Sequence, residues 1–444
     1  MRILSEKLPV LVAILGKFEI RKRRNMRKIK NVLVLAGGDS TRFWPLKDKM
    51  FWSFLGNSLI KNLIAGFSGY SENIFVVVSH SNLAKIKKTL DNKVHIIIQK
   101  NELKGIGGAI LSCQDKINGE TLIVNASDIF VPTLIKRLIK ELKPEKEMIL
   151  FAKRYDDYFP GGYLKFTNGR LVEIVEKPGK DITPSKLVKL VFDYFGDLNH
   201  LINALKKINA VLDDWYESAI NQLIKNGIKN DVFEHKDYLY PLKYPWQVLI
   251  ITDFFLKTIK SNKIDNSAVI SKNAVIKGPV YIGKNVKIGD FAKISGPVFI
   301  DDGATIADHT IIYQSHIGKS CLVGGYSEVT RSYLSEGVML HRNYVGDSVL
   351  GSQVMMGAGV ATANFRFDGK NISSRVNENK IDTGLIKFGA IIGNGAKIGV
   401  NSTILPGIKI GSNTFIAPGE IVQEDIKNNI FFIKGKKRNN KIVR

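Results

Sequence analysis

Isoleucine recurs at every sixth position along one stretch of this chain. The series runs through Ile264, Ile270, Ile276, Ile282, Ile288, Ile294, Ile300, Ile306 and Ile312. It returns at Ile386, Ile392, Ile398, Ile404, Ile410 and Ile416, with Val422 next. A period of six matches neither the 3.6-residue helix nor the two-residue strand. It is typical of hexapeptide coils, in which each short strand turns one apolar side chain inward and three strands close one turn. The spacing therefore predicts a parallel β-helix in the second half of the chain.

Length and cysteine content indicate a globular protein of several domains without a disulfide framework. Its 444 residues predict two or three domains, and a hydrophobic content of 44% is ordinary for a globular protein. Cys113 and Cys321 fall in different halves and form no metal-ligand spacing. This usage fits a reducing, cytoplasmic environment, and we expect no membrane association.

The chain is strongly basic, with a formal net charge of +24. Residues 1–26, a basic extension, and 433–444, a basic tail, carry part of this charge, and whether translation starts at Met1 or Met26 stays open. Binding of nucleic acid through these ends is the weakest hypothesis, because no aromatic residues interleave with the basic runs. A basic surface would also attract anionic phosphate substrates.

The first half alternates strand-like and helix-like segments. Apolar runs at 31–35, 73–78, 94–98 and 121–124 predict parallel strands, with helices between them at 59–64 and 103–117. This alternation predicts an α/β, Rossmann-like domain with a mostly parallel mixed sheet. We expect it to span 27–257, with a helix-rich part at 184–228, and the β-helix to span 258–432. The period of six is disturbed between 313 and 385, where the polar residues 365–384 predict a loop leaving the coils.

A glycine-rich loop follows the first predicted strand, with the sequence Leu35-Ala-Gly-Gly-Asp-Ser-Thr-Arg-Phe-Trp-Pro-Leu46. Glycines let backbone N–H groups approach a phosphate chain, and Arg42 would neutralise it. The loop matches neither the Walker sequence nor the spacing of dinucleotide-binding loops.

This loop resembles the signature of sugar-1-phosphate nucleotidylyltransferases, in which a lysine follows, here Lys49. The resemblance implies that a sugar-1-phosphate attacks a nucleoside triphosphate and releases pyrophosphate, with Arg42 and Lys49 as catalytic residues. It implies a nucleotide site made of Leu35, Gly37, Gly38, Ser40, Thr41, Gln99 and Gly105. It also implies that Gly162, Glu176 and Lys177 bind the sugar phosphate and that Asp128 holds Mg²⁺.

One position departs from the family pattern at the metal site. Pro241 stands where the family often has a second aspartate as metal ligand. Either Asp237 substitutes for it, or Asp128 and the substrate phosphates hold magnesium alone.

The disturbed part of the period contains His341-Arg-Asn-Tyr344-Val-Gly-Asp347, then Met356-Gly-Ala-Gly359 and Asn364. This resembles the acetyltransferase half of bifunctional N-acetylglucosamine-1-phosphate uridylyltransferases, which have a left-handed β-helix that forms a homotrimer. The resemblance implies that His341 is the general base and that acetyl-CoA is a co-substrate lying beside Ala358. Tyr344, Asn364 and Arg331 would bind the sugar phosphate. Met355 departs from the family's asparagine, and its side chain cannot hydrogen-bond a sugar hydroxyl as an asparagine can.

Two main hypotheses follow from these motifs. The first is a nucleotide-sugar enzyme whose best-fitting product is UDP-N-acetylglucosamine, with glucose-1-phosphate or mannose-1-phosphate as alternative substrates. The second is a non-catalytic relative that senses nucleotide sugars, which Pro241 and Met355 favour.

Overall fold

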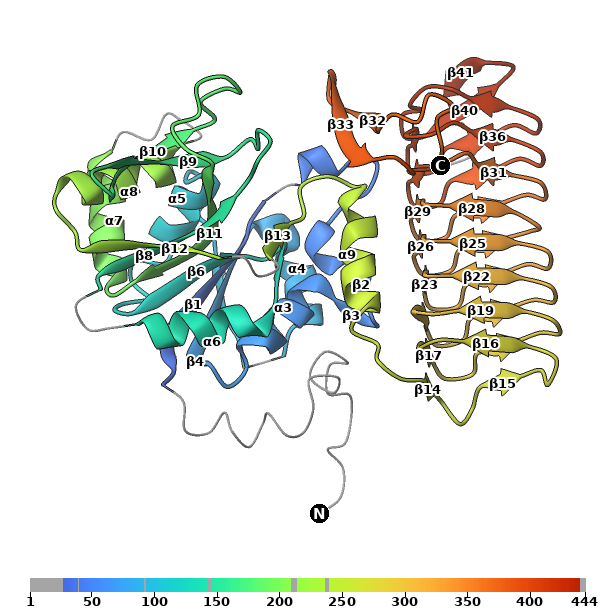
Figure 1. Ribbon diagram of the computed structural model, residues 1–444, viewed down its shortest axis with the longest axis horizontal. Helices are drawn as coiled ribbons and strands as arrows, with labels where there is room; N and C mark the ends of the chain where they lie inside the picture. Colours follow the sequence, from blue (N-terminus) through green and yellow to red (C-terminus); the bar gives the residue numbers. More distant parts are fainter. Residues whose placement is uncertain are drawn as a thin grey trace. The chain divides into compact units, whose positions relative to one another are not determined.

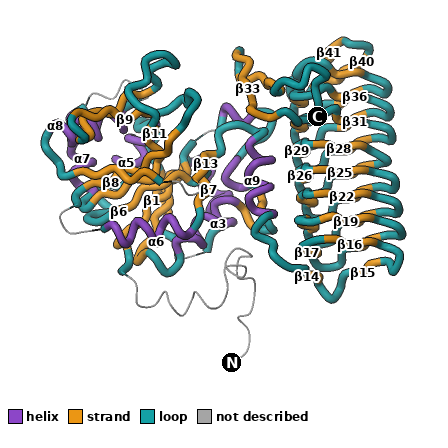
Figure 2. The backbone as a smooth tube through the Cα atoms, in the orientation of Figure 1, coloured by secondary structure: helices purple, strands orange, loops and turns teal. Residues whose placement is uncertain are grey.

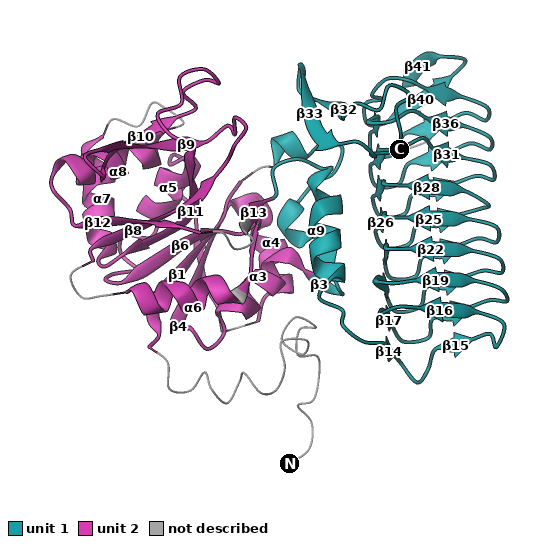
Figure 3. Cartoon of the chain, viewed as in Figure 1, with its two compact units in different colours: residues 1–14, 40–57, 242–444 teal, residues 15–39, 58–241 magenta. Residues whose placement is uncertain are grey.

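A computed structural model describes residues 27–38, 40–91, 93–142, 146–208, 214–235 and 239–439. The predicted basic extension at 1–26, with both candidate start positions, and Asp237 lie outside these residues. The described chain forms two compact units (Figure 3). The sheet unit comprises 27–38 and 58–241, and the coil unit comprises 40–57 and 242–439. No helix in the described part of the chain is long and apolar enough to cross a membrane.

The sheet unit contains a 9-stranded mixed sheet in which β10, β9, β11, β6, β1, β4 and β5 are successive neighbours, β8 pairs with β11, and β12 pairs with β8. Its strands are β1 (Ile29–Ala36), β4 (Ser71–Val78), β5 (His95–Ile98), β6 (Thr121–Asn125), β8 (Met148–Arg154), β9 (Gly162–Thr167), β10 (Arg170–Glu176), β11 (Leu187–Phe195) and β12 (Asn230–Glu234). The central strands β6, β1, β4 and β5 are parallel, as the alternating pattern predicts. Their carboxyl ends therefore open on one edge of the sheet.

Helices pack on both faces of this sheet (Figure 1). They are α3 (Leu59–Phe67), α4 (His80–Thr89), α5 (Gly105–Leu111), α6 (Pro132–Glu141), α7 (Leu198–Lys207) and α8 (Trp215–Lys225). One apolar core joins α5, α7 and α8 to side chains such as Leu33 and Val77 on the sheet. Outside the main sheet, β7 (Asp128–Phe130) pairs with β13 (Leu239–Pro241).

Two expectations for the sheet unit are wrong in part. Residues 187–195, expected in a helix-rich part, form strand β11, because β-branched and aromatic residues favour an extended chain there. The helix expected at 103–117 ends at Leu111, after which the chain continues in turns.

The coil unit is a parallel β-helix with three long sheets, as the period of six predicts (Figure 2). The first sheet contains β14 (Lys263–Ile264), β17 (Val280–Ile282), β20 (Val298–Ile300), β23 (His316–Ile317), β26 (Tyr333–Leu334), β29 (Val349–Leu350), β34 (Ile391–Ile392) and β37 (Lys409–Ile410). The second contains β15 (Val269–Ile270), β18 (Lys287–Ile288), β21 (Thr305–Ile306), β24 (Leu322–Val323), β27 (Met339–Leu340), β30 (Met355–Met356), β35 (Lys397–Ile398), β38 (Phe415–Ile416), β40 (Ile430–Ile433) and β41 (Lys436–Asn439). The third contains β16 (Val275–Lys277), β19 (Lys293–Ser295), β22 (Ile311–Tyr313), β25 (Glu328–Thr330), β28 (Tyr344–Gly346), β31 (Ala361–Thr362), β36 (Thr403–Ile404) and β39 (Ile421–Val422).

Inward side chains stack on the same position of the next coil and form one continuous core. Ile282 pairs with Ile300, which pairs with Ile317. Ile264 and Ile386, which the period places inside, are instead exposed. Ile264 lies on an edge strand of its sheet, and Ile386 lies between hairpin strand β33 and β34, where the coils resume.

The coils continue through 313–385, where a disturbance is expected. Val, Leu and Met replace isoleucine there, and some turns are one residue shorter, as between Ile312 and Ile317. The expected polar loop contains an antiparallel hairpin of β32 (Ile372–Val376) and β33 (Asn379–Leu385). In the basic tail, Lys436–Asn439 form β41, which pairs with β40.

The coil unit also contains a segment that precedes the coils in the sequence. It comprises η2 (Thr41–Phe43), η3 (Lys49–Phe51), β2 (Ser53–Phe54), which pairs with β3 (Asn57–Ser58), and the later helix α9 (Gln247–Leu256). Phe54 stacks on Phe255 of α9, with ring centroids 5.1 Å apart, and Tyr333 of β26 lies 5.7 Å from Phe54.

Candidate functional site

The carboxyl ends of β1 and β5 bring three of the predicted nucleotide-binding residues together. Gln99, just after β5, donates its side-chain N–H to the carbonyls of Leu103 at 2.7 Å and Gly105 at 3.2 Å. A Cβ on Gly37 would lie 2.3 Å from the Gln99 amide oxygen, so any larger residue here would require the Gln99 side chain to move. The amide therefore holds the loop that begins α5 while its oxygen faces the glycine-rich loop. Leu35 accepts a backbone hydrogen bond from Ala126, which joins this loop to the one that carries Asp128.

Asp128 is the predicted magnesium ligand, and it begins β7 with 5% exposure. Asn125 donates to its carboxylate at 3.4 Å. Pro241 is its direct cross-strand partner on β13, so the position expected to carry a second carboxylate does face Asp128 and carries none. The described residues contain no group of three or more His, Cys, Asp or Glu that could hold a metal. One carboxylate still suits Mg²⁺, which is often bound by one or two carboxylates together with substrate phosphates.

The residues predicted to contact the sugar phosphate meet on the hairpin of β9 and β10. Gly162 lies opposite Glu176, and a Cβ on Gly162 would approach a carboxylate oxygen of Glu176 to 3.2 Å. Lys177 has a left-handed backbone, donates its N–H to the carbonyl of Gly161, and pairs with Glu176 at 3.2 Å. The hairpin therefore presents one ammonium and one carboxylate side by side.

A buried charged cluster that the motifs miss lies beside this hairpin. Lys189 of β11 pairs with Asp193 at 2.7 Å, and the Tyr216 hydroxyl donates to the same carboxylate oxygen at 2.7 Å. Glu217 lies 4.0 Å from the Lys189 ammonium, and its Cγ is 3.8 Å from a Cβ built on Gly162. Burial raises the pKa of the Asp193 and Glu217 carboxyls. The signal in the sequence is two opposite charges, four residues apart, inside an otherwise apolar strand.

The predicted residues Ser40, Thr41, Arg42 and Lys49 belong to the coil unit. Ser40 has a left-handed backbone and caps the short turn η2, on which Thr41 and Arg42 are exposed. The Lys49 ammonium donates to the carbonyl of Leu242 at 3.0 Å. This arrangement exposes one guanidinium and fixes one ammonium on the same short segment.

Coil residues hold this segment in place. The Trp44 indole N–H donates to the Asn428 side chain at 3.0 Å, and the Lys409 ammonium lies 4.7 Å from the centre of the Trp44 ring. Lys409 is buried and pairs with Asp425 at 3.5 Å. The Tyr333 hydroxyl donates to the carbonyl of Ser53 at 2.7 Å. The position of Arg42 and Lys49 therefore depends on the β-helix.

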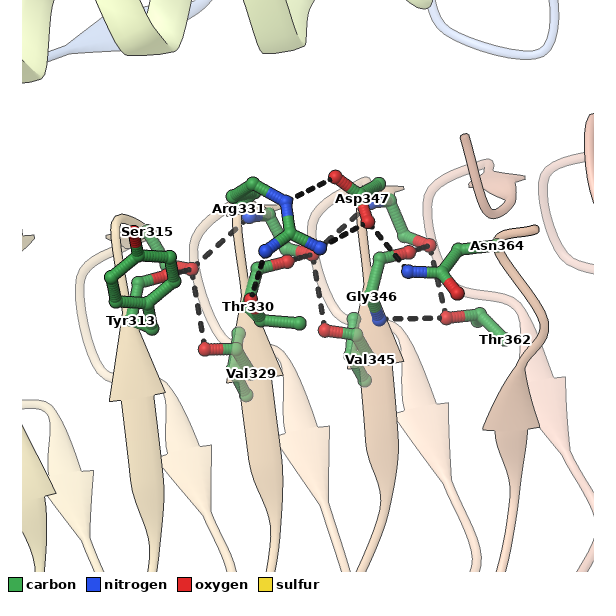
Figure 4. Close-up of polar contacts among 12 residues, drawn as sticks. Tyr313, Ser315, Val329, Thr330, Arg331, Val345, Gly346, Asp347, Thr362 and Asn364 are labelled. Atoms are coloured by element: carbon green, nitrogen blue, oxygen red, sulfur yellow. Dashed lines mark hydrogen bonds and ion pairs between the residues drawn. The ribbon is translucent and has the colours of Figure 1, made fainter. Parts of the chain in front are cut away.

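In the coils, a second polar cluster brings together residues from successive coils, and Figure 4 shows three of them, Arg331, Asp347 and Asn364. The Arg331 guanidinium makes two hydrogen bonds to the Asp347 carboxylate, at 2.6 and 2.7 Å. Asn364 donates to Asp347 at 2.5 Å and to the Tyr344 hydroxyl at 3.2 Å. A Cβ on Gly346 would come within 2.7 Å of that hydroxyl, so this glycine lets the Tyr344 ring fold back. Three of the predicted residues thus form one network, and Asp347 is the member that joins them.

His341 and Ala358 lie at another turn of the coils, between the second and third sheets. His341 follows β27 and Ala358 follows β30, the next strand of that sheet. Both residues are exposed, and Asn343 links the two turns by donating to the carbonyl of Gly357 at 2.7 Å. No described hydrogen bond joins the His341 ring to Tyr344 or Asn364. Within one chain the structure therefore groups His341 with Ala358, apart from the Arg331 network.

The chain matches three family models. The MobA-like NTP transferase domain matches residues 32–215, the GMPPB C-terminal domain matches 258–382, and the bacterial transferase hexapeptide (six repeats) matches 389–419. These matches cover both units.

Similar curated proteins extend over nearly the whole chain. A bifunctional sugar-1-phosphate nucleotidylyltransferase/acetyltransferase of Sulfurisphaera tokodaii is 32% identical over 412 residues, which cover 90% of this chain and 98% of the relative. The bifunctional protein GlmU of Methanococcus maripaludis is 29% identical over 417 residues, 91% of this chain and 97% of the relative. That of Methanococcus vannielii is 28% identical over 418 residues, with the same coverage.

Proposed function

The chain belongs to the family of bifunctional sugar-1-phosphate nucleotidylyltransferases/acetyltransferases, and we propose that it makes UDP-N-acetylglucosamine from UTP and N-acetylglucosamine-1-phosphate. We propose further that its coil unit transfers an acetyl group from acetyl-CoA to glucosamine-1-phosphate. The observation that carries the choice of sugar is the network of Arg331, Tyr344, Asp347 and Asn364. A site that acetylates a hexosamine phosphate yields the N-acetylated sugar phosphate that the nucleotidyl transfer would consume.

In the nucleotidyl transfer, a phosphate oxygen of the sugar-1-phosphate bonds to the α-phosphorus of UTP. The bond from that phosphorus to the bridging oxygen breaks, and pyrophosphate leaves. Such enzymes work mainly by positioning the reactants and neutralising charge. We assign the triphosphate to Arg42 and Lys49, the base to Gln99 and Gly105, and the sugar phosphate to Lys177.

The remaining predicted residues have positioning and metal-binding roles in this proposal. Leu35, Gly37, Gly38, Ser40 and Thr41 would bring backbone N–H groups to the nucleotide, and Gly162 and Glu176 would contact the sugar. Asp128 would hold Mg²⁺, which neutralises phosphate charge when bound. Lys189, which pairs with Asp193 and lies 4.0 Å from Glu217, would help to position the residues beside this hairpin.

In the acetyl transfer, the amine of glucosamine-1-phosphate attacks the thioester carbonyl carbon of acetyl-CoA. A C–N bond forms, the C–S bond breaks, and His341 takes the amine proton and returns it to the departing thiolate. The exposed His341 ring is free to do this in the described chain, and Ala358 lies at the adjacent turn, where acetyl-CoA would bind. Arg331 would meet the sugar phosphate, with Tyr344 and Asn364 on its hydroxyls.

Pyrophosphate release tests the first half of the proposal. Purified protein with Mg²⁺ is given UTP, dTTP, GTP or CTP, each with N-acetylglucosamine-1-phosphate, glucose-1-phosphate or mannose-1-phosphate. We expect release with UTP and N-acetylglucosamine-1-phosphate, and its loss in Asp128→Asn. Preference for another pair would reject the substrates but keep the reaction.

Release of free thiol from acetyl-CoA, dependent on glucosamine-1-phosphate, tests the second half. We expect His341→Ala to reduce it by about 100-fold or more, the range of general-base catalysis. His309→Ala is the matched control, because His309 is also an exposed histidine in the coils. Equal loss in both variants would reject the role of His341.

Pro241 favours one second candidate, a non-catalytic sensor of nucleotide sugars, because it faces Asp128 where a carboxylate is expected. A sensor would bind UTP but release no pyrophosphate with any pair. In that case Pro241→Asp, which places a second carboxylate opposite Asp128, should create or strengthen Mg²⁺-dependent turnover. If the native protein turns over, Pro241 is tolerated and the sensor is rejected.

We also propose that the protein is cytoplasmic and forms a homotrimer through the coil unit. The two described cysteines, Cys113 and Cys321, are buried free thiols, as a reducing compartment allows. Light scattering of the full chain checks the assembly, since a mass of one or two chains would exclude the trimer.

A further inference from the structure

A hollow of about 580 Å³ opens in the sheet unit at the starts of β1, β4 and β5. Residues that give it its chemistry are Lys30, Asn73, Phe75, His95, Lys116 and Asn118. The predicted nucleotide residues Gly37 and Gln99 lie at the other ends of these strands. Asn31 and Gly37 are six residues apart along β1, so about 20 Å separate the two ends at about 3.3 Å per residue. The hollow therefore lies on the amino-terminal side of these strands, and its nearest lining residue on β5, Ile97, is two residues from Gln99.

Its wall is an aromatic surface. Phe75 and His95 are direct partners on β4 and β5, and their rings stack with centroids 4.9 Å apart and planes 27° from parallel. They lie on the face of the sheet that α5 covers, but α5 ends at Leu111. The helix thus stops before it reaches this end of the sheet, which leaves His95 exposed.

The rim of the hollow carries two lysines, and hydrogen bonds from asparagine side chains hold the chain around one of them in place. The Lys30 ammonium donates to the Asn118 side chain at 3.0 Å, and Asn73 donates to the Lys30 carbonyl at 3.2 Å. Asn31, buried beneath, donates to the Asn118 carbonyl at 2.9 Å. Lys116 is exposed and has no ion pair with a described residue. These bonds fix one ammonium and leave the second available to a ligand.

No acidic residue is among the described residues that line the hollow. The Glu120 carboxylate accepts a hydrogen bond from the Lys30 backbone N–H at 3.0 Å. Arg27 pairs with Glu120 at 2.6 Å, and the Tyr194 hydroxyl donates to it at 2.8 Å, so its charge is already compensated. The hollow therefore presents two lysine ammonium groups beside an aromatic wall.

We propose that this hollow is a second binding site for a nucleoside phosphate. The base would stack against the Phe75–His95 pair, and the phosphates would lie between Lys30 and Lys116. Stacking on an aromatic side chain together with ammonium contacts to phosphate is a general way to hold a nucleotide. The volume lies within the roughly 300–1,000 Å³ of small-molecule sites.

The test counts UTP molecules bound per chain by titration calorimetry, with full-length protein and Mg²⁺ but no sugar phosphate, so that no turnover occurs. We expect two per chain in the native protein. Lys116→Glu should weaken the second site by at least about tenfold and leave one, as should His95→Ala. Arg42→Glu should remove the other site and keep this one. Inorganic phosphate and uridine should each compete only weakly, because each supplies half of the ligand.

Lys88→Glu on α4 is the matched control, since it makes the same charge change on an exposed lysine outside the hollow. It should still bind two UTP molecules, and circular dichroism should show all variants folded. One UTP per chain in the native protein, or equal losses in Lys116→Glu and Lys88→Glu, would overturn the proposal. The count is independent of pyrophosphate release, so failure of the proposed reaction is recognised separately.

Discussion

Gly37 lies directly against the Gln99 amide in the proposed nucleotide site. We expect Gly37→Ala to lower the free energy of unfolding by about 1–3 kcal/mol, because its methyl group would press on the Gln99 amide. The loop at Leu103 and Gly105 would then lose its anchor, and the affinity for UTP should fall. Chemical denaturation and UTP titration measure the two effects.

The double variant Gly37→Ala/Gln99→Ala checks the cause of this effect. Gln99→Ala removes the amide that the new methyl group would meet. If the clash is responsible, the loss of unfolding free energy in the double variant is smaller than the sum of the losses in the two single variants. Additive losses would place the strain elsewhere.

His316 is a second residue whose surroundings determine its chemistry. Its ring stacks between Phe299 and Tyr333, and its ring nitrogens are shielded from water. Burial lowers its pKa from 6.5 to about 4. The folded protein therefore keeps this imidazole neutral where the unfolded chain takes up a proton.

Stability should consequently fall as the pH drops from about 6.5 to 4. At about 1.4 kcal/mol per pKa unit, His316 accounts for roughly 3 kcal/mol of that loss. His316→Phe keeps a flat ring in the stack and should reduce this fall in the free energy of unfolding at low pH. Urea denaturation at several pH values measures it. His309→Phe, in an exposed stack, is the control and should leave the slope unchanged. An equal slope in native protein and His316→Phe would contradict the prediction.

Among the elements, strands β25, β28 and β31 matter because their ends carry the polar network of the coils. Asp347 accepts hydrogen bonds from Arg331 and Asn364, and it is nearly buried. We expect Asp347→Ala to cost about 2 kcal/mol of stability, because Arg331 would lose its charged partner. Acetyl transfer should fall with it, since Asn364 would also lose its anchor. Thermal unfolding and thiol release are the measurements.

The hairpin insertion offers the matched control for that change. Arg366 and Asp368 form the same kind of ion pair, at 2.6 Å, on an exposed turn. Asp368→Ala should leave the unfolding temperature within error, since exposed pairs contribute little. A similar loss in both variants would mean that the network has no special role.

For the whole molecule, the segment from residue 40 to 57 packs in the coil unit although it begins in the glycine-rich loop. A fragment ending at residue 257 retains Arg42 and Lys49 but loses Asn428, Lys409 and Tyr333, which hold their segment. We expect its kcat/KM for nucleotidyl transfer to fall about 100-fold or more, because small displacements of catalytic groups are costly. Pyrophosphate release by the two proteins is the comparison.

Trp44→Ala in the full chain separates this effect from misfolding of the fragment. It removes the bond to Asn428 and the contact with Lys409 but keeps every coil. Turnover should fall while the unfolding of the coils stays cooperative. Trp44→Phe keeps a ring over Lys409 and should lose less. Full activity in the fragment would show that the coils are not needed.

The period-six isoleucines were sufficient to predict the β-helix, because each coil repeats the same local environment and so the same residue type. The positions of the glycine-rich loop and Asp128 after apolar strands were likewise predicted, while their binding roles stay predictions. The prediction was wrong where an apolar run was ambiguous, as at β11, or where a residue in phase with the repeat precedes the first strand after an insertion, as at Ile386.

Contacts between distant segments were decided only by the tertiary structure. Trp44 and Asn428 are 384 residues apart, and Lys409 gives no local sign that it supports the loop of Arg42. Contacts between distant segments also produce the pairing of Pro241 with Asp128, the cluster around Lys189 and the hollow at Lys116. A sequence pattern reports which side chains are buried, but which buried surfaces meet depends on packing the whole chain at once.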